Sequence, residues 1–87
     1  MLYLVAYRCE GDQPHPLEEL LPSLSDNCWR AFDNVWVIES DQTAALLRDR
    51  IRMHLGEGEA AIVALLAGHA AWHGFEPRSQ DWLLAHL

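Results

Sequence analysis

Two histidines of the chain have a spacing that can bind a metal ion. His69 and His73 are four residues apart, so on a helix they would share one face, as zinc ligands can. No glutamate stands between them, and the sequence places no third ligand. A histidine at the edge of the core or in solvent is the favoured interpretation, and we predict no metal site there.

The other histidines and the two cysteines give weaker signals. His15 lies between prolines and His54 near a predicted helix end, which favours loop and capping roles. Cys9 and Cys28 lack a CxxC spacing, so we expect free thiols. No glycine-rich phosphate loop, nucleophile elbow or Cys-His pairing is visible.

Aromatic and basic residues could bind nucleic acid, but the charge balance opposes it. Tryptophan faces can stack on single-stranded bases, and the four of this chain are Trp29, Trp36, Trp72 and Trp82. The net charge of −7 argues against binding nucleic acid by bulk attraction. Core and dimer-interface positions are therefore favoured for these rings. Arg8 and Arg30 are the basic residues that strands would position, and we predict that they contact a partner or nucleic acid.

Composition limits the chain to one ordinary globular domain. The sequence has 87 residues, 51% hydrophobic and 22% charged, which excludes intrinsic disorder and predicts a single domain over 1–87. No segment reaches the roughly 18 consecutive apolar residues of a membrane span. The start, Met1-Leu2-Tyr3, lacks the basic region of a signal peptide, so we expect a cytoplasmic protein without membrane contact.

The first half of the chain predicts a strand, a helix and a hairpin. Residues 2–8 alternate as a strand with two apolar faces. Pro16 suits a first helical position, and leucines at 17, 20, 21 and 24 mark one face of a short helix. Residues 28–32 and 35–39 then form a hairpin around Asp33-Asn34.

The second half predicts a helix, a strand and a helical tail. Ser40 or Asp41 can cap a helix that ends at Gly56. Residues 60–66 are the most apolar part of the chain and predict a strand, although the alanines also suit a helix. We expect a compact turn or short helix over 68–75 and a last helix capped by Ser79.

This order of elements predicts an α+β, ferredoxin-like βαββαβ fold with a C-terminal helical tail. In that topology the first and third strands are central, and the apolar strand 60–66 lies at an edge. Long apolar edges are hazards that proteins cover or pair. We therefore predict a homodimer that buries this edge, the second sheet face, or both, and the expected interface residues are Tyr3, Tyr7, Trp36, Ile62 and Ala64.

Four segments of the chain are distinctive when taken together. They are the strand Leu-Tyr-Leu-Val-Ala-Tyr, the hairpin end Asn-Val-Trp-Val-Ile, the helix segment Leu-Arg-Asp and the motif Gly68-x-Ala70-Ala71-Trp72-x-Gly74-Phe75. Through these segments, and the motif most of all, the sequence resembles the small proteins called SinR-like, which are similar to VapD toxins and to the small CRISPR adaptation-complex subunit. The resemblance covers nearly the whole chain. It implies a ferredoxin-like homodimer and, for the SinR-like members, no settled activity.

The nuclease relatives imply a metal-dependent reaction that this chain departs from. In them a Tyr-Asp pair ends the first strand, and the aspartates of a dimer are thought to hold a divalent metal. The matching pair here is Tyr7-Arg8, and arginine cannot ligate a metal. Glu10 and Asp12 are the weak catalytic candidates, and they could substitute only if their loop folds back.

We therefore expect a homodimeric interaction module without nuclease activity and without a cofactor. The alternative is a metal-dependent endoribonuclease of the VapD-like class, which would need magnesium or manganese. A third possibility is that the acidic surface mimics nucleic acid and binds a basic partner.

Overall fold

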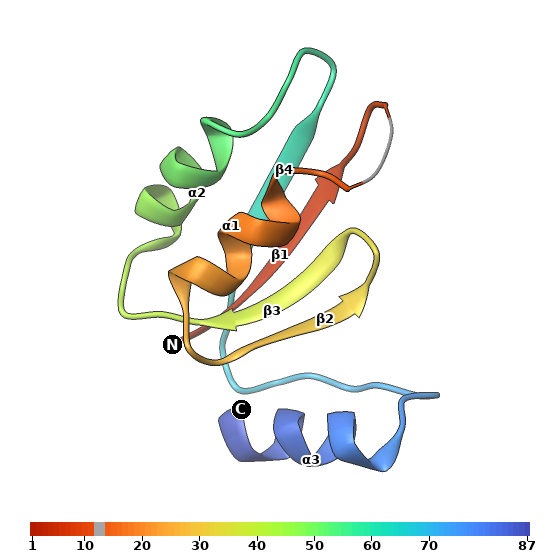
Figure 1. Cartoon of the computed structure of the whole chain (residues 1–87). Coiled ribbons are helices and arrows are strands. Elements are labelled where there is room, and N and C mark those ends of the chain that lie inside the picture. The colour runs from red at the N-terminus through yellow and green to blue at the C-terminus, as the bar shows by residue number, and fades with distance from the viewer. Residues whose placement is uncertain (12–13) are drawn as a thin grey trace.

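The computed structural model of the chain describes residues 1–11 and 14–87 and contains four strands and three helices (Figure 1). In chain order they are β1 Leu2–Arg8, α1 Leu17–Leu24, β2 Cys28–Phe32, β3 Val35–Glu39, α2 Ala44–Arg52, β4 Ala60–Leu66 and α3 Pro77–His86. The fold is therefore α+β, as the sequence predicts. Among the described residues, no helix is both long and apolar enough to cross a membrane.

The four strands form one antiparallel sheet in the order β2-β3-β1-β4. The predictions that the first and third strands are central and that the last strand lies at an edge are both confirmed. This strand order and these directions are compatible with the predicted ferredoxin-like arrangement. Leu2 pairs with Leu66 and Arg8 with Ala60, so β4 follows β1 along its whole length.

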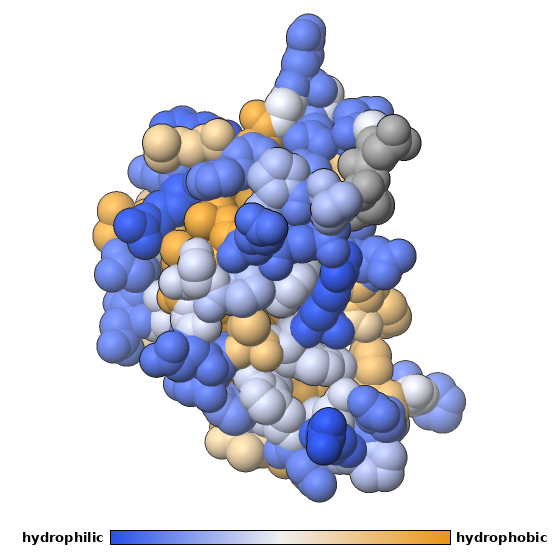
Figure 2. Space-filling model, in the orientation of Figure 1, coloured by the Kyte–Doolittle hydropathy of each residue, from blue (hydrophilic) through white to orange (hydrophobic). Residues whose placement is uncertain are grey.

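The core lies between the sheet and the two helices α1 and α2, which cover the same face (Figure 1). Strand residues of one alternating set meet the apolar faces of the helices. The buried members of this core are Tyr3, Val5, Tyr7, Trp36, Ile38, Leu17, Leu21, Leu47 and Ile51. Seen from this side, the surface is mostly hydrophilic, with hydrophobic atoms visible between the helices (Figure 2).

Tyr3, Tyr7 and Trp36 occupy a different place from the one predicted. We expected them on a second sheet face at a dimer interface, but they lie in the core beneath the helices, with 2 to 6% of their surfaces exposed. The physical reason is that both alternating sets of β1 are apolar, so alternation alone does not show which set the helices cover. The polar ends of the two tyrosines are satisfied there, because Tyr3 donates to Gln42 O at 2.6 Å and Tyr7 to Asp33 O at 3.3 Å.

The helix starts also differ from the prediction. Pro16 is the residue before α1 instead of its first residue. Thr43, not Ser40 or Asp41, caps α2, since its side chain accepts a hydrogen bond from the Leu46 N–H at 3.2 Å. Ser79 lies inside α3, which begins with Pro77, a favoured residue for a first helical turn.

The tail crosses to the sheet face opposite α1 and α2. Residues 67–76 contain no helix, in contrast to the compact turn or short helix that we expected. Trp29 holds α3 on the β2 side of that face: its ring meets Phe75 edge-on at 4.8 Å between centroids, and its Nε1 donates to Ser79 Oγ at 3.1 Å. The β4 side of the same face has much less cover, and Ile62 there is 66% exposed.

Candidate functional site

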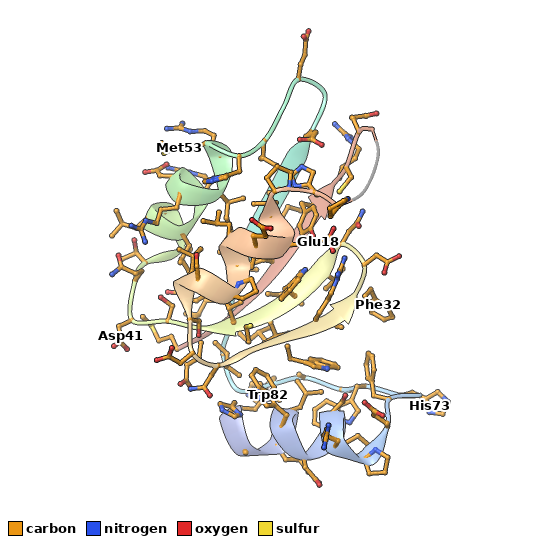
Figure 3. All side chains as sticks on the ribbon, viewed as in Figure 1. Glu18, Phe32, Asp41, Met53, His73 and Trp82 are labelled. Carbon is orange, nitrogen blue, oxygen red and sulfur yellow. The ribbon has the colours of Figure 1, made fainter. Side chains whose placement is uncertain are left out.

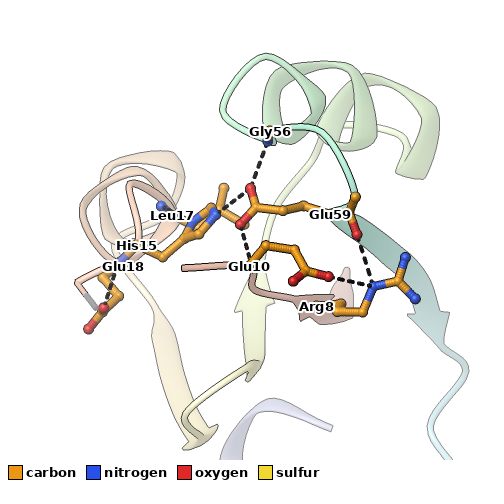
Figure 4. A network of polar contacts seen from close by, with 8 residues as sticks. Arg8, Glu10, His15, Leu17, Glu18, Gly56 and Glu59 are labelled. Atoms are coloured by element: carbon orange, nitrogen blue, oxygen red, sulfur yellow. Dashed lines mark hydrogen bonds and ion pairs between the residues drawn. The ribbon is translucent and has the colours of Figure 1, made fainter. Parts of the chain in front are cut away.

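A buried carboxylate joins two loops at the end of β1 (Figure 4). Glu59 Oε1 accepts a hydrogen bond from the Gly56 N–H at 2.6 Å and lies 2.9 Å from His15 Nε2. Its other oxygen accepts from the Glu10 N–H at 2.9 Å. The side chains of His15 and Glu59 are only 5% and 6% exposed. Glu59 therefore ties the segment that follows β1 to the turn that precedes β4.

The hydrogen bonds of His15 determine its tautomer. Its Nδ1 accepts from the Leu17 N–H at 3.1 Å, so the proton of the neutral ring is on Nε2 and is donated to Glu59. A general base would need a free ring nitrogen facing a substrate. Both ring nitrogens have partners within the protein, which favours a structural role for this buried pair.

The pKa of Glu59 falls from 4.5 to about 2 because the ionised form is strongly hydrogen-bonded. The Gly56 N–H makes the largest contribution, followed by the His15 ring and the Glu10 N–H. Glu59 therefore stays charged at neutral pH and cannot serve as a general acid.

Arg8 lies at the position where the resemblance would require a metal-binding aspartate. Its Nε donates to Gly58 O at 3.0 Å and is 4.0 Å from Glu10 Oε1, and both side chains are more than half exposed (Figure 4). The Glu10 carboxylate thus faces a cation. Asp12, the other catalytic candidate, lies outside the described residues. Within residues 1–11 and 14–87, no group of three or more histidine, cysteine, aspartate or glutamate residues could hold a metal ion.

The side chain of Arg30 connects β2 to the hairpin turn and to α1. It forms an ion pair with Glu18 at 2.7 Å, donates twice to Asp33 O at 2.9 and 3.3 Å, and its guanidinium lies 5.4 Å from the Trp36 ring centre. The pKa of Glu18 is lowered, first by the N–H of His15 and then by Arg30. Arg8 and Arg30 therefore lie in separate places, beside β4 and on β2.

The remaining histidines form no site. His69 and His73 are exposed in the non-helical segment 67–76, so they share no helix face, and Figure 3 shows His73 projecting away from the body. The capping role predicted for His54 is confirmed, because its Nδ1 lies 3.2 Å from Arg50 O at the end of α2.

Three of the tryptophans, Trp29, Trp36 and Trp82, pack against other parts of the protein. Trp36 is in the core. The ring centroids of Trp29 on β2 and Trp82 on α3 lie 6.2 Å apart, and Figure 3 shows Trp82 between α3 and the sheet. Cys9 and Cys28 are free thiols, as predicted, and burial raises the pKa of Cys28. The thiolate of Cys28, which is the reactive form, is therefore disfavoured.

The edge strand β4 exposes apolar side chains to solvent. Ile62 and Leu65 are 66% and 53% exposed, and Ala64 is also exposed. An open depression beside them is lined by Ala6, Tyr7, Arg8, Ala60, Ala61 and Ile62. The sequence of β4, Ala-Ala-Ile-Val-Ala-Leu-Leu, contains no polar residue. Of the five predicted interface residues, the structure therefore leaves only Ile62 and Ala64 exposed to a partner.

The pair of His15 and Glu59 was missed by the sequence analysis. The two residues are 44 positions apart, and neither lies in a periodic pattern that would place it in the interior. The only local signal is that His15 is followed by Pro16 and three residues later by Glu18, whose carboxylate accepts the His15 N–H at 2.9 Å and helps to start α1.

Comparisons of the chain with protein-family models, with curated proteins and with solved structures found no match.

Proposed function

We propose that this chain is a ferredoxin-like interaction module that acts as a homodimer and has no nuclease activity. The observation that carries the proposal is the edge strand β4, which is apolar over its whole length and has β1 as its neighbour on one side only. Exposed edges of this kind are ready to pair with another chain, and proteins usually block them with charges, proline or bulges. β4 has none of these devices.

The end of β1 supports the non-catalytic part of the proposal. Arg8 carries a positive charge where a metal would need a carboxylate, and it pairs with Glu10. Glu59 is already bonded to three groups of the protein. Neither carboxylate thus resembles an open metal ligand.

The experiment for this part is incubation of the purified protein with labelled RNA and magnesium or manganese. We expect intact RNA. Cleavage that disappears in the Glu10→Ala or Asp12→Ala variant would overturn the proposal in favour of a metal-dependent endoribonuclease.

The dimer is tested by a matched pair of charge substitutions. Ile62 and Leu84 are almost equally exposed, at 66% and 68%, but Ile62 is on β4 and Leu84 is on α3. Ile62→Glu would place a charge on each copy at the interface. We expect the dissociation constant of the dimer, measured by sedimentation equilibrium, to rise at least tenfold in this variant. Leu84→Glu adds the same charge elsewhere and should leave the dimer intact, so equal weakening by both variants would contradict an interface at β4.

A further inference from the structure

The hydrogen bonds of β1 determine which backbone groups of β4 are free. The Tyr7 N–H donates to Asn34 O at 3.0 Å, and Met1 O accepts from the Ser40 N–H at 2.8 Å. Odd-numbered residues of this strand therefore direct their N–H and C=O groups toward β3. Because these directions alternate along a strand, the even-numbered residues direct theirs toward β4.

The register between β1 and β4 shows which residues of β4 are hydrogen-bonded to β1 and which point outward. Ala6 is paired with Ile62 and Leu4 with Ala64, so even-numbered residues of β4 form the hydrogen bonds to β1. The backbone groups of Ala61, Val63 and Leu65 then point away from the sheet. These three residues form the unpaired row of the edge.

This row is symmetric about Val63. Ala61 and Leu65 lie two residues to either side of it, and the positive-φ glycines Gly58 and Gly68, at 82° and 84°, lie five residues to either side. Positive φ at these glycines ends the extended chain at both limits. Two copies of β4 related by a two-fold axis at Val63 would consequently begin and end together.

We infer that β4 pairs antiparallel with β4 of a second copy, in the register that places Val63 opposite Val63. Ala61 then lies opposite Leu65 of the second copy, and each of the three outward residues donates and accepts one hydrogen bond across the axis. The inference rests on the proposed homodimer and specifies its geometry: two four-stranded sheets joined edge to edge into one continuous sheet.

The side chains fit this register. Ile62, 66% exposed, would lie directly opposite the small Ala64 of the second copy, and Leu65, 53% exposed, opposite Ala61. The strand carries no charge, so no like charges lie opposite each other in the pairing.

The same geometry closes the assembly at two copies. Pairing through identical edges buries β4 of both chains, so the two β2 strands are the only unpaired edges of the joined sheet. β2 is shorter, carries Arg30, and has an irregular register between Arg30 and Phe32. Such features discourage further strand addition, which favours a discrete dimer over a fibre.

A proline substitution at Leu65 tests the hydrogen-bonded edge directly. Leu65→Pro removes an N–H that points away from β1, so the intramolecular pairing of β4 is kept. Leu65→Thr also loses the apolar side chain but keeps the N–H. We expect Leu65→Pro to be a folded monomer by circular dichroism and sedimentation, and Leu65→Thr to remain a dimer.

A cross-linking experiment gives a second test that does not depend on the folding of a proline variant. In the predicted register, residue 62 of one copy and residue 64 of the other form a non-hydrogen-bonded pair with Cα atoms about 4.5 Å apart, which suits a disulfide. With Cys9→Ser and Cys28→Ser in all chains, a mixture of Ile62→Cys and Ala64→Cys proteins should give a mixed covalent dimer on mild oxidation. A mixture of Ile62→Cys and Leu84→Cys proteins should not.

The outcomes separate the two proposals. If the unmodified protein is a dimer but Leu65→Pro stays dimeric, or if the 62 and 64 cysteines fail to cross-link, the edge register is wrong and the homodimer stands. If the unmodified protein is monomeric at micromolar concentration, the homodimer and the register both fail.

Discussion

At the residue scale, the most constrained groups of this chain serve its architecture. Glu59 is held by two backbone N–H groups and by His15, and Arg30 is held by Glu18 and the hairpin turn. These are the residue types from which active sites are built, but their polar atoms bond to the protein itself. Burial of an ionised group requires such partners, which explains the dense bonding of Glu59.

The lowered pKa of Glu59 makes a prediction for acid stability. Its folded-state pKa of about 2 is below the ordinary 4.5, so protonation favours the unfolded chain. The stabilisation by this carboxylate is complete above pH 4.5 and is lost as the pH falls toward 2. In Glu59→Gln we expect a lower melting temperature at pH 7 and a smaller loss between pH 5 and pH 2 than in the unmodified protein. Thermal melts across this pH range measure both effects, and an unchanged pH profile would contradict the assignment.

At the element scale, the strands could be predicted from sequence and the helix starts could not. All four strands have the predicted bounds, which follow from the apolar runs, the Asp33-Asn34 turn and Gly58. The cap of α2 was assigned to Ser40 or Asp41, since three capping-type residues occur within a few positions of one another, and only the backbone geometry selects Thr43. The face of the sheet that α3 covers could not be predicted, because it depends on a long-range contact. Trp29 and Ser79 are 50 residues apart in the sequence, and their hydrogen bond holds α3 on that face.

The position of the cap can be measured through stability. Thr43→Ala removes the side-chain oxygen that accepts the Leu46 N–H, and loss of such a cap costs about 1 kcal/mol of unfolding free energy. Asp41→Ala, at an exposed site outside the helix, should cost much less. Urea unfolding measures the free energy of unfolding of both variants. A larger loss of stability in Asp41→Ala than in Thr43→Ala would contradict the assignment of the cap to Thr43.

At the scale of the whole molecule, the chain has more apolar surface than its core uses. Two helices cover one face of the sheet, α3 covers the β2 side of the other, and β4 remains open at its edge. A domain of 87 residues buries only roughly 60 to 65% of its unfolded surface, so pairing through β4 would add stability that a single copy lacks. The exposed edge could be predicted from sequence, whereas the register about Val63 required the strand pairing.

The oligomeric state of the unmodified protein is the most direct measurement. Sedimentation equilibrium at micromolar concentration should give twice the chain mass of 9.9 kDa, and dilution should shift the protein toward monomer. The dimer should persist at high salt, because its contacts along β4 are apolar and backbone-mediated. A single species of one chain mass across the micromolar range would contradict the homodimer, and with it the function proposed for β4.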